Sequence, residues 1–153
     1  MRLEKASEAE RRLLMSFKCS EFETHPWVPG PPLNKRRVAI ITTAGLHGRE
    51  DRPFRMDPQD FFRTIPGNVQ PNDLVMSHMA ASFDRTGFQR DWNVVFPLDR
   101  LRELLAEKII GSLAATHYSF NSAHEPVDFK EAAYEVAHRL RKDSVDAVLP
   151  LPA

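Results

Sequence analysis

A short apolar run, Arg37-Val-Ala-Ile-Ile-Thr42, constrains the fold more than any other feature of the sequence. Its central residues are consecutively apolar and mostly β-branched, which is typical of a strand that is covered on both faces. Comparable short runs at residues 73–77, 93–96 and 145–149 are predicted to form further strands. Buried strands that alternate with helices are typical of α/β proteins, in which a parallel sheet lies between helices.

Amphipathic helices are predicted before and between these strands. A capping box that begins at Ser7 precedes a helix over Glu8–Phe17. A second helical face runs from Leu98 to Ile109 and is closed by Gly111, and a third helix begins at Asp128. The predicted buried face of the third helix consists of Phe129, Ala132, Ala133, Val136, Ala137 and Leu140.

The segment between the first two strands is rich in loops. Asp57-Pro58 is predicted to start a short helical turn that contains Phe61 and Phe62, and Ile65-Pro66-Gly67 is predicted to be a turn. The whole pattern favours an α/β fold, a three-layer Rossmann-like domain with a largely parallel sheet. We expect one such domain over residues 26–153, preceded by an N-terminal helical segment over residues 1–25.

Charge and cysteine content exclude several classes of protein. The 21 Lys and Arg residues balance 21 Asp and Glu residues, so no net charge favours nucleic acid or anionic lipid. The apolar runs are far shorter than a membrane span, and residues 1–10 lack the apolar core of a signal peptide, so we expect a cytoplasmic protein. The single cysteine, Cys19, excludes an internal disulfide and any Cys-x-x-Cys motif.

Polar residues follow two of the predicted strands at the points where the strands end. His47 follows the first strand and His78 the second, so parallel neighbours would bring both imidazoles to one edge of the sheet. There they could act as a general acid or base, or bind a ligand. Alternatively, each histidine could cap a strand end or bond to a loop carbonyl. Thr43, Gly45 and Ser77 lie beside them and are candidate substrate-binding residues.

Two further candidates for substrate binding, His117 and Tyr118, lie between two predicted helices. The alternative is an irregular strand that packs on the core through Tyr118 and Phe120. No metal is assigned, because no further histidine or carboxylate stands at ligand spacing from these histidines. The glycine-containing turn over residues 42–48 lacks the G-x-G-x-x-G pattern and the P-loop lysine, so no cofactor is identified.

Several blocks of the sequence, in one order, resemble a known family. They are Val38-Ala-Ile-Ile-Thr-Thr-Ala-Gly-Leu-His47, Asp73-Leu-Val-Met-Ser-His78, Val95-Phe-Pro-Leu-Asp-Arg-Leu-Arg-Glu-Leu104, Gly111-Ser-Leu-Ala-Ala-Thr-His-Tyr-Ser-Phe120 and Asp143-Ser-Val-Asp-Ala-Val-Leu149. Together they resemble the selenoprotein B family of glycine, sarcosine, betaine and D-proline reductases. The resemblance runs from about Pro26 to the C-terminus, and His47 and His78 match it.

The resemblance implies a component that activates a small amino-acid-like or amine substrate. In that family a selenocysteine or cysteine attacks the carbon that bears the amino group, because a chalcogen anion is a strong nucleophile at neutral pH. That nucleophile would follow the strand at residues 145–149, where this chain has Pro150-Leu-Pro-Ala153, and Cys19 does not match its position. We therefore expect the nucleophile to come from another chain.

Three functions remain open on the sequence alone. The first is a reductase component whose nucleophile is supplied by another chain. The second is a non-catalytic subunit for ligand binding or assembly, and the third is a histidine-based metal-dependent enzyme. An unpaired edge on the last strand further predicts a homo-oligomer, or a complex with a partner subunit that carries a reactive cysteine or selenocysteine.

Overall fold

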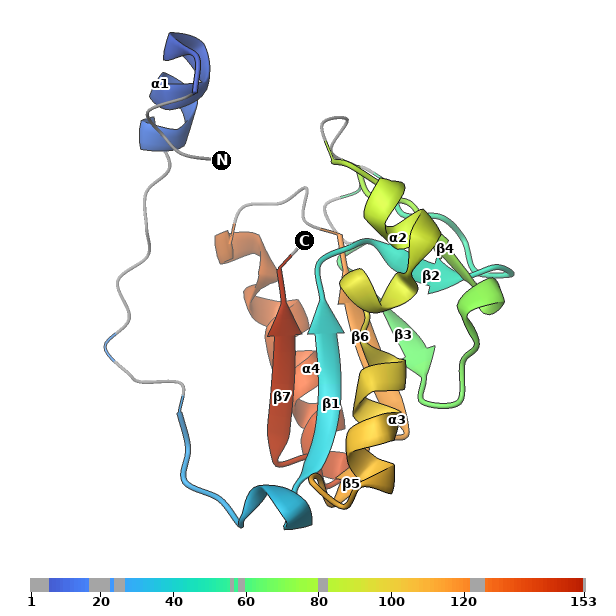
Figure 1. The fold of residues 1–153 in the computed structure, drawn as a ribbon. Coiled ribbons are helices and arrows are strands. Elements are labelled where there is room, and N and C mark those ends of the chain that lie inside the picture. Colours follow the sequence, from blue (N-terminus) through green and yellow to red (C-terminus); the bar gives the residue numbers. More distant parts are fainter. Residues whose placement is uncertain are drawn as a thin grey trace.

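In a computed structural model of the chain, the residues described are 6–16, 23, 27–55, 57, 60–79, 83–121 and 126–152. They form a mixed α/β fold built on a five-stranded sheet (Figure 1). The strands of this sheet are β1 (Arg37–Thr42), β3 (Phe62–Pro66), β5 (Ser112–Leu113), β6 (Thr116–Phe120) and β7 (Ala147–Leu151). A separate two-stranded sheet consists of β2 (Leu46–Gly48) and β4 (Leu74–Met76).

The helices flank these sheets. The α-helices are α1 (Glu8–Ser16), α2 (Thr86–Arg90), α3 (Leu98–Ala106) and α4 (Lys130–Lys142). Short 3-10 helices are η2 (Leu33–Lys35), η3 (Pro71–Asp73), η4 (Trp92–Val94) and η5 (Pro126–Phe129). Figure 1 shows α3 and α4 on opposite sides of the five-stranded sheet, with α1 apart from it. None of the helices in the described ranges is long and apolar enough to cross a membrane.

The predicted strand over Arg37–Thr42 is confirmed, and it is the centre of the larger sheet. β1 pairs in parallel with β7 along most of its length, with β5 at its first residues and with β6 at its last. Only β3, which pairs with β6, is antiparallel. The largely parallel sheet that the sequence predicts is therefore present, and within the described residues β7 has β1 as its only strand neighbour.

The two faces of β1 bury separate hydrophobic clusters. Val38 and Ile40 face a cluster that includes α3, whereas Ala39 faces a cluster that includes α4. This alternation follows from the two-residue period of a strand. Because both faces of β1 are buried, consecutive residues of the strand must all be apolar. The larger cluster contains the buried residues Leu46, Ile65, Trp92, Phe96, Leu98 and Leu101, and the smaller one contains Tyr118, Phe120, Ala132, Val136 and Leu140.

The predicted helices are confirmed with adjusted ends. α3 stops at Ala106, before the predicted end at Ile109, and Lys108 then takes a positive φ of 59°. α4 buries Ala132, Val136 and Leu140 as predicted. Ala133 is exposed, contrary to the prediction, because a step of one residue turns it about 100° away from that stripe.

The predicted strand over residues 93–96 is wrong. Trp92–Val94 is the 3-10 helix η4, because a side chain bonds to its backbone and a side chain of η4 bonds to the backbone of α3. The Asp91 carboxylate accepts a hydrogen bond from the Asn93 backbone N–H at 2.9 Å, and Asn93 Oδ1 accepts one from the Asp99 N–H at 3.1 Å. Such side-chain bonds compete with strand pairing for short apolar segments.

The predicted helical turn around Phe61 and Phe62 is also wrong, and Pro58 lies outside the described residues. Phe62 begins β3, whose last residues are Ile65 and Pro66, so the turn comes only at Gly67. The Phe62 ring contacts the rings of two residues on β6, with centroids 6.0 and 5.4 Å apart. These contacts across the strands favour pairing over a local turn.

The predicted strand over residues 73–77 is confirmed as β4, but its partner differs from the prediction. It pairs antiparallel with β2 rather than joining the parallel sheet. β7 begins at Ala147, two residues later than predicted, after a turn in which Ser144 takes a positive φ of 54°. The boundary predicted between residues 25 and 26 stays a prediction, and Cys19 lies outside the described residues.

Candidate functional site

The loop that leaves β1 folds back over the carboxyl end of β6. The Leu46 N–H donates to the Ser119 hydroxyl at 2.7 Å, and the Gly45 N–H donates to the Phe120 carbonyl at 2.9 Å. Ala44 forms an isolated bridge with Asn121. These contacts place β2, and with it His47, at the edge of the sheet where parallel strands of α/β proteins usually present a site.

Gly45 brings this loop into contact with the end of β4. Its carbonyl accepts the Ser77 N–H at 2.9 Å, and its φ is 64°. A Cβ at this position would lie 3.0 Å from the His78 Cα, which is tighter than nine in ten real Cβ contacts. Glycine is required here both by the left-handed backbone and by the close approach of the two chain segments.

Replacing Gly45 with alanine is expected to lower the free energy of unfolding by about 1–2 kcal/mol, because an L-residue is strained at positive φ and the His78 backbone must move. Urea denaturation measures the change. Gly87→Ala is the matched control, since Gly87 lies in α2 and a Cβ there would meet only a Val94 side-chain atom at 3.4 Å. Equal stability of the two variants would contradict the requirement for glycine at Gly45.

His47 and Ser77 form a hydrogen-bonded pair at this edge. The buried His47 ring lies 2.6 Å from the Ser77 hydroxyl through Nε2 and 2.7 Å from the Gly48 carbonyl through Nδ1. A carbonyl can only accept, so in the neutral ring Nδ1 carries the proton and Nε2 accepts the hydroxyl proton of Ser77. The pair is thus arranged for proton transfer through the Ser77 hydroxyl.

His78 follows Ser77 directly and is buried. Its ring is stacked on Phe83 with centroids 4.1 Å apart and planes 20° apart. Its carbonyl accepts a hydrogen bond from Arg85 at 2.7 Å. The structure therefore brings together four of the predicted site residues, Gly45, His47, Ser77 and His78. It does so through the antiparallel β2–β4 pair rather than through parallel neighbours.

Three other predicted site residues lie elsewhere. Thr43 stands where β1 ends beside β7, with its N–H bonded to the Leu151 carbonyl at 3.1 Å. Tyr118 packs in the cluster that includes α4, on the face of β6 opposite His117. Burial raises the pKa of Tyr118 above its usual range. Tyr118 is thus placed as the alternative interpretation predicts, as a strand residue packed on the core.

His117 bonds to the central strand. Its Nδ1 accepts the Ile40 N–H at 3.0 Å, at a residue of β1 between those paired with β5 and those paired with β6. The ring also contacts Phe96 edge-on, with centroids 5.6 Å apart. Burial, and secondarily the charge of Arg102, lowers the pKa of His117 to about 4. The neutral ring therefore replaces a missing strand partner for Ile40.

One residue of this region was missed by sequence reasoning. Asn121 directly follows β6 and is fully buried, and neither its amide oxygen nor its amide nitrogen has a hydrogen-bond partner among the described residues. Its position just past a strand end, like that of His78, is the signal that could have identified it. Nowhere in the described ranges do three His, Cys, Asp or Glu side chains gather as metal ligands could.

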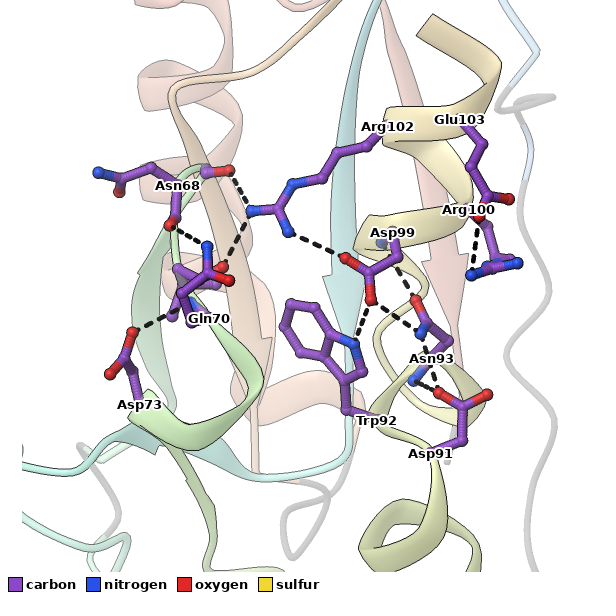
Figure 2. A network of polar contacts seen from close by, with 12 residues as sticks. Asn68, Gln70, Asp73, Asp91, Trp92, Asn93, Asp99, Arg100, Arg102 and Glu103 are labelled. Carbon is purple, nitrogen blue, oxygen red and sulfur yellow. Dashed lines mark hydrogen bonds and ion pairs between the residues drawn. The ribbon is translucent and has the colours of Figure 1, made fainter. Parts of the chain in front are cut away.

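A polar network lies beside this region (Figure 2). Asp99 accepts hydrogen bonds from the Trp92 indole at 2.6 Å, from Asn93 at 3.1 Å and from Arg102 at 2.9 Å. Arg102 also donates to the carbonyls of Gly67 and Val69 at 3.2 and 2.9 Å. Trp92, Asn93 and Asp99 line an open cleft of about 510 Å³, together with Arg49, Pro71, Asn72, Leu74, Phe88, Gln89, Arg90 and Asp91.

The sequence matches a known family over most of its length. The family model for glycine/sarcosine/betaine reductase selenoprotein B matches residues 17–151. The chain is 33% identical over 126 residues to the D-proline reductase subunit gamma of Acetoanaerobium sticklandii, a match that covers 80% of this chain and 51% of that protein.

More distant relatives are longer. The chain is 29% identical over 130 residues to the glycine reductase complex component B subunit gamma of Symbiobacterium thermophilum, which covers 79% of this chain and 30% of that protein. Identity to the betaine reductase complex component B subunit beta of Peptoclostridium acidaminophilum is 28% over 126 residues, or 79% of this chain and 29% of that protein. The chain thus spans about half the length of the first relative and under a third of the others. No solved structure matches the chain.

Proposed function

The chain belongs to the glycine/sarcosine/betaine reductase selenoprotein B family, and we propose that it is a component of a reductase complex that acts on a small amino-acid-like or amine substrate. The proposal includes a second chain that supplies the redox nucleophile. A second chain is supported by the names of the relatives, which are subunits or complex components. It is also supported by the cysteine content, because Cys19 is the only cysteine of these 153 residues. The observation that carries the proposal is the His47–Ser77 pair beside His78.

In the proposed reaction, a thiolate or selenolate of the second chain attacks the substrate carbon that bears nitrogen. The lone pair of the nucleophile forms the new bond, and the C–N bonding pair leaves with nitrogen. The nitrogen departs as a neutral amine, because it starts as an ammonium group. A pair of thiols then supplies two electrons. The carbon takes up the chalcogen–carbon bonding pair and a proton, the thiols end as a disulfide, and the nucleophile is restored.

The proposed role of His47 is proton transfer to and from the substrate through the Ser77 hydroxyl. The Gly48 carbonyl fixes the ring so that Nε2 faces that hydroxyl. A proton taken up at Nε2 can be passed through Ser77 to the substrate carbon in the reductive step, because the hydroxyl both donates and accepts. His78, which is held by Phe83, is the second proposed catalytic residue, and the loop over Thr43 and Gly45 is proposed to bind substrate.

His47→Asn is expected to lower the rate of reductive C–N cleavage by about 10²-fold or more, the usual size of a lost acid–base catalyst. The measurement uses the complex purified from its own host, with a dithiol reductant. It follows the ammonia or amine released from glycine, sarcosine or betaine, and the open-chain amino acid formed from D-proline. His138→Asn is the matched control, because His138 is exposed on α4.

Three results would contradict the proposal. They are undiminished cleavage by the His47→Asn complex, cleavage by this chain without a second chain, and no cleavage of any of the four compounds. Binding of a compound with no turnover in any pairing would instead favour the non-catalytic subunit. The metal-dependent enzyme gains no support from the described residues, because no three of their His, Cys, Asp or Glu side chains gather as metal ligands could.

The proposal extends to architecture and setting. We propose that the helices on opposite sides of the largely parallel sheet are layers of a three-layer Rossmann-like domain. A cytoplasmic location is part of the proposal, supported by the charge balance and the low cysteine content. Assembly with itself or with a partner subunit is also proposed, and it is supported by the exposed Val148 on β7, whose only strand neighbour in the described residues is β1.

A further inference from the structure

His117, Ser119 and Asn121 are buried polar residues on β6 or directly after it. Ser119 accepts a backbone hydrogen bond from Leu46, and His117 accepts one from Ile40 through Nδ1, although its Nε2 has no partner among the described residues. Asn121 is as deeply buried as both, yet neither of its amide atoms has a partner among the described residues. Buried amides are almost always bonded, so an amide without partners among the described residues points to a group outside them, such as a ligand.

The position of Asn121 connects it to the His47–Ser77 pair. Asn121 bridges Ala44, and the next residue, Gly45, accepts the Ser77 N–H. Asn121 directly follows β6, two residues beyond Ser119. The two-residue period of the strand, continued through the bridge to Ala44, would direct its side chain to the same face as the Ser119 hydroxyl that holds Leu46. The unpaired amide therefore belongs to the same edge of the sheet as the proposed proton-transfer pair.

We propose that Asn121 is a specificity-determining residue that binds the amino acid substrate. Its amide nitrogen donates to the substrate carboxylate, and its amide oxygen accepts an N–H of the substrate ammonium group. This inference rests on the proposed function and narrows its substrate class to amino acids that keep at least one N–H, such as glycine, sarcosine and proline. A quaternary amine such as betaine offers no N–H, so the amide oxygen would stay unpaired.

The burial of Asn121 has two consequences for such a site. A ligand bound there is enclosed, so water does not compete for the amide. Without ligand the amide is buried unsatisfied, and its removal should not destabilise the chain. A variant without the amide should therefore bind the ligand more weakly while staying as stable as wild type. A residue that only packs would show the reverse, a loss of stability without a loss of binding.

The test compares wild type, the nearly isosteric Asn121→Leu and the control Asn68→Leu, whose asparagine is exposed on the turn after β3. Calorimetry measures the binding of glycine, sarcosine, D-proline and betaine to the full-length protein, together with its partner chain where one copurifies. We expect Asn121→Leu to weaken glycine binding by about tenfold or more, the usual loss for hydrogen bonds to charged groups. Its thermal midpoint should equal or exceed that of wild type, and betaine should bind wild type more weakly than glycine.

Two results overturn this inference alone: glycine binding that Asn121→Leu leaves unchanged, and betaine binding as tight as that of glycine. A lower midpoint with unchanged binding would assign the amide to an enclosed water. If wild type binds none of glycine, sarcosine, betaine and D-proline, the proposed function fails and the inference fails with it. Should Asn121→Leu not fold, Asn121→Ala tests the same loss of binding in a smaller side chain.

Discussion

Replacing Asp99 with alanine is expected to lower the free energy of unfolding by about 2–4 kcal/mol, because several buried or half-buried donors lose their acceptor at once. The indole N–H of Trp92 would be left without a partner inside the larger hydrophobic cluster. Arg102 would keep its bonds to the carbonyls of Gly67 and Val69 but lose its carboxylate. The Asp99 side chain joins α3 to η4 and, through Arg102, to the turn after β3 (Figure 2).

The protonation of Asp99 supports this estimate. Burial acts to raise the pKa of Asp99, but the hydrogen bonds from Trp92, Asn93 and Arg102 outweigh it and hold the pKa below its usual range. The folded state thus stabilises the carboxylate, a contribution that is present above the unfolded pKa and lost as the pH falls through the lower folded pKa. Part of the network is reached by solvent, with Asp99 and Arg102 side chains 34% and 30% exposed, so the upper end of the range is a limit.

Urea denaturation at neutral pH measures the effect. Glu103→Ala is the matched control, because Glu103 pairs with Arg100 on the same helix at 2.9 Å and both side chains are more than half exposed. That exposed pair should contribute less than about 1 kcal/mol. Asp99→Asn, which keeps an acceptor for the indole, should fall between the two. The network has no structural importance if Asp99→Ala costs no more than Glu103→Ala.

The sequence predicted those parts of the fold that depend on residues close together in the chain. β1 follows from its consecutive apolar residues, and the buried face of α4 follows from the four-residue spacing of Ala132, Val136 and Leu140. The parts that were mispredicted depend on distant partners or on side-chain bonds. β3 exists because Phe62 packs on β6, more than fifty residues away, and η4 exists because Asp91 and Asn93 bond to nearby backbone. The spacing of apolar residues along the chain, with a period of two in strands and 3.6 in helices, indicates neither distant contacts nor side-chain bonds to the backbone.

The sequence predicted which residues form the candidate site, but it did not predict the strand pairing that brings them together. The idea that polar residues gather where strands end found His47 and Ser77, and the structure brings them within 2.6 Å. The pairing that does this, β2 with β4, could not be read from two three-residue strands, which are too short for a clear pattern. Asn121 was missed because an asparagine directly after a strand is typical of a turn. Only its burial without partners distinguishes it.

His117 is expected to make the stability of the protein depend on pH between about 4 and 6.5. Its pKa is lowered from 6.5 to about 4, first by burial and then by the charge of Arg102. The unfolded chain therefore binds a proton in this range while the folded chain does not. The stabilisation is fully present above pH 6.5 and is lost as the pH falls through 4, by about 3 kcal/mol in total.

The measurement is the free energy of unfolding in urea at several pH values between 4 and 7.5, for wild type and for His117→Gln. His117→Gln removes the titrating ring but also the Nδ1 acceptor of the Ile40 N–H, so it should be less stable than wild type by about 1–2 kcal/mol at pH 7. As the pH falls the variant should lose less stability than wild type, so the two curves should converge and then cross before pH 4. The control His138→Gln, at an exposed position on α4, should keep the wild-type dependence. Parallel curves for wild type and His117→Gln would show that the buried neutral ring does not control the response to acid.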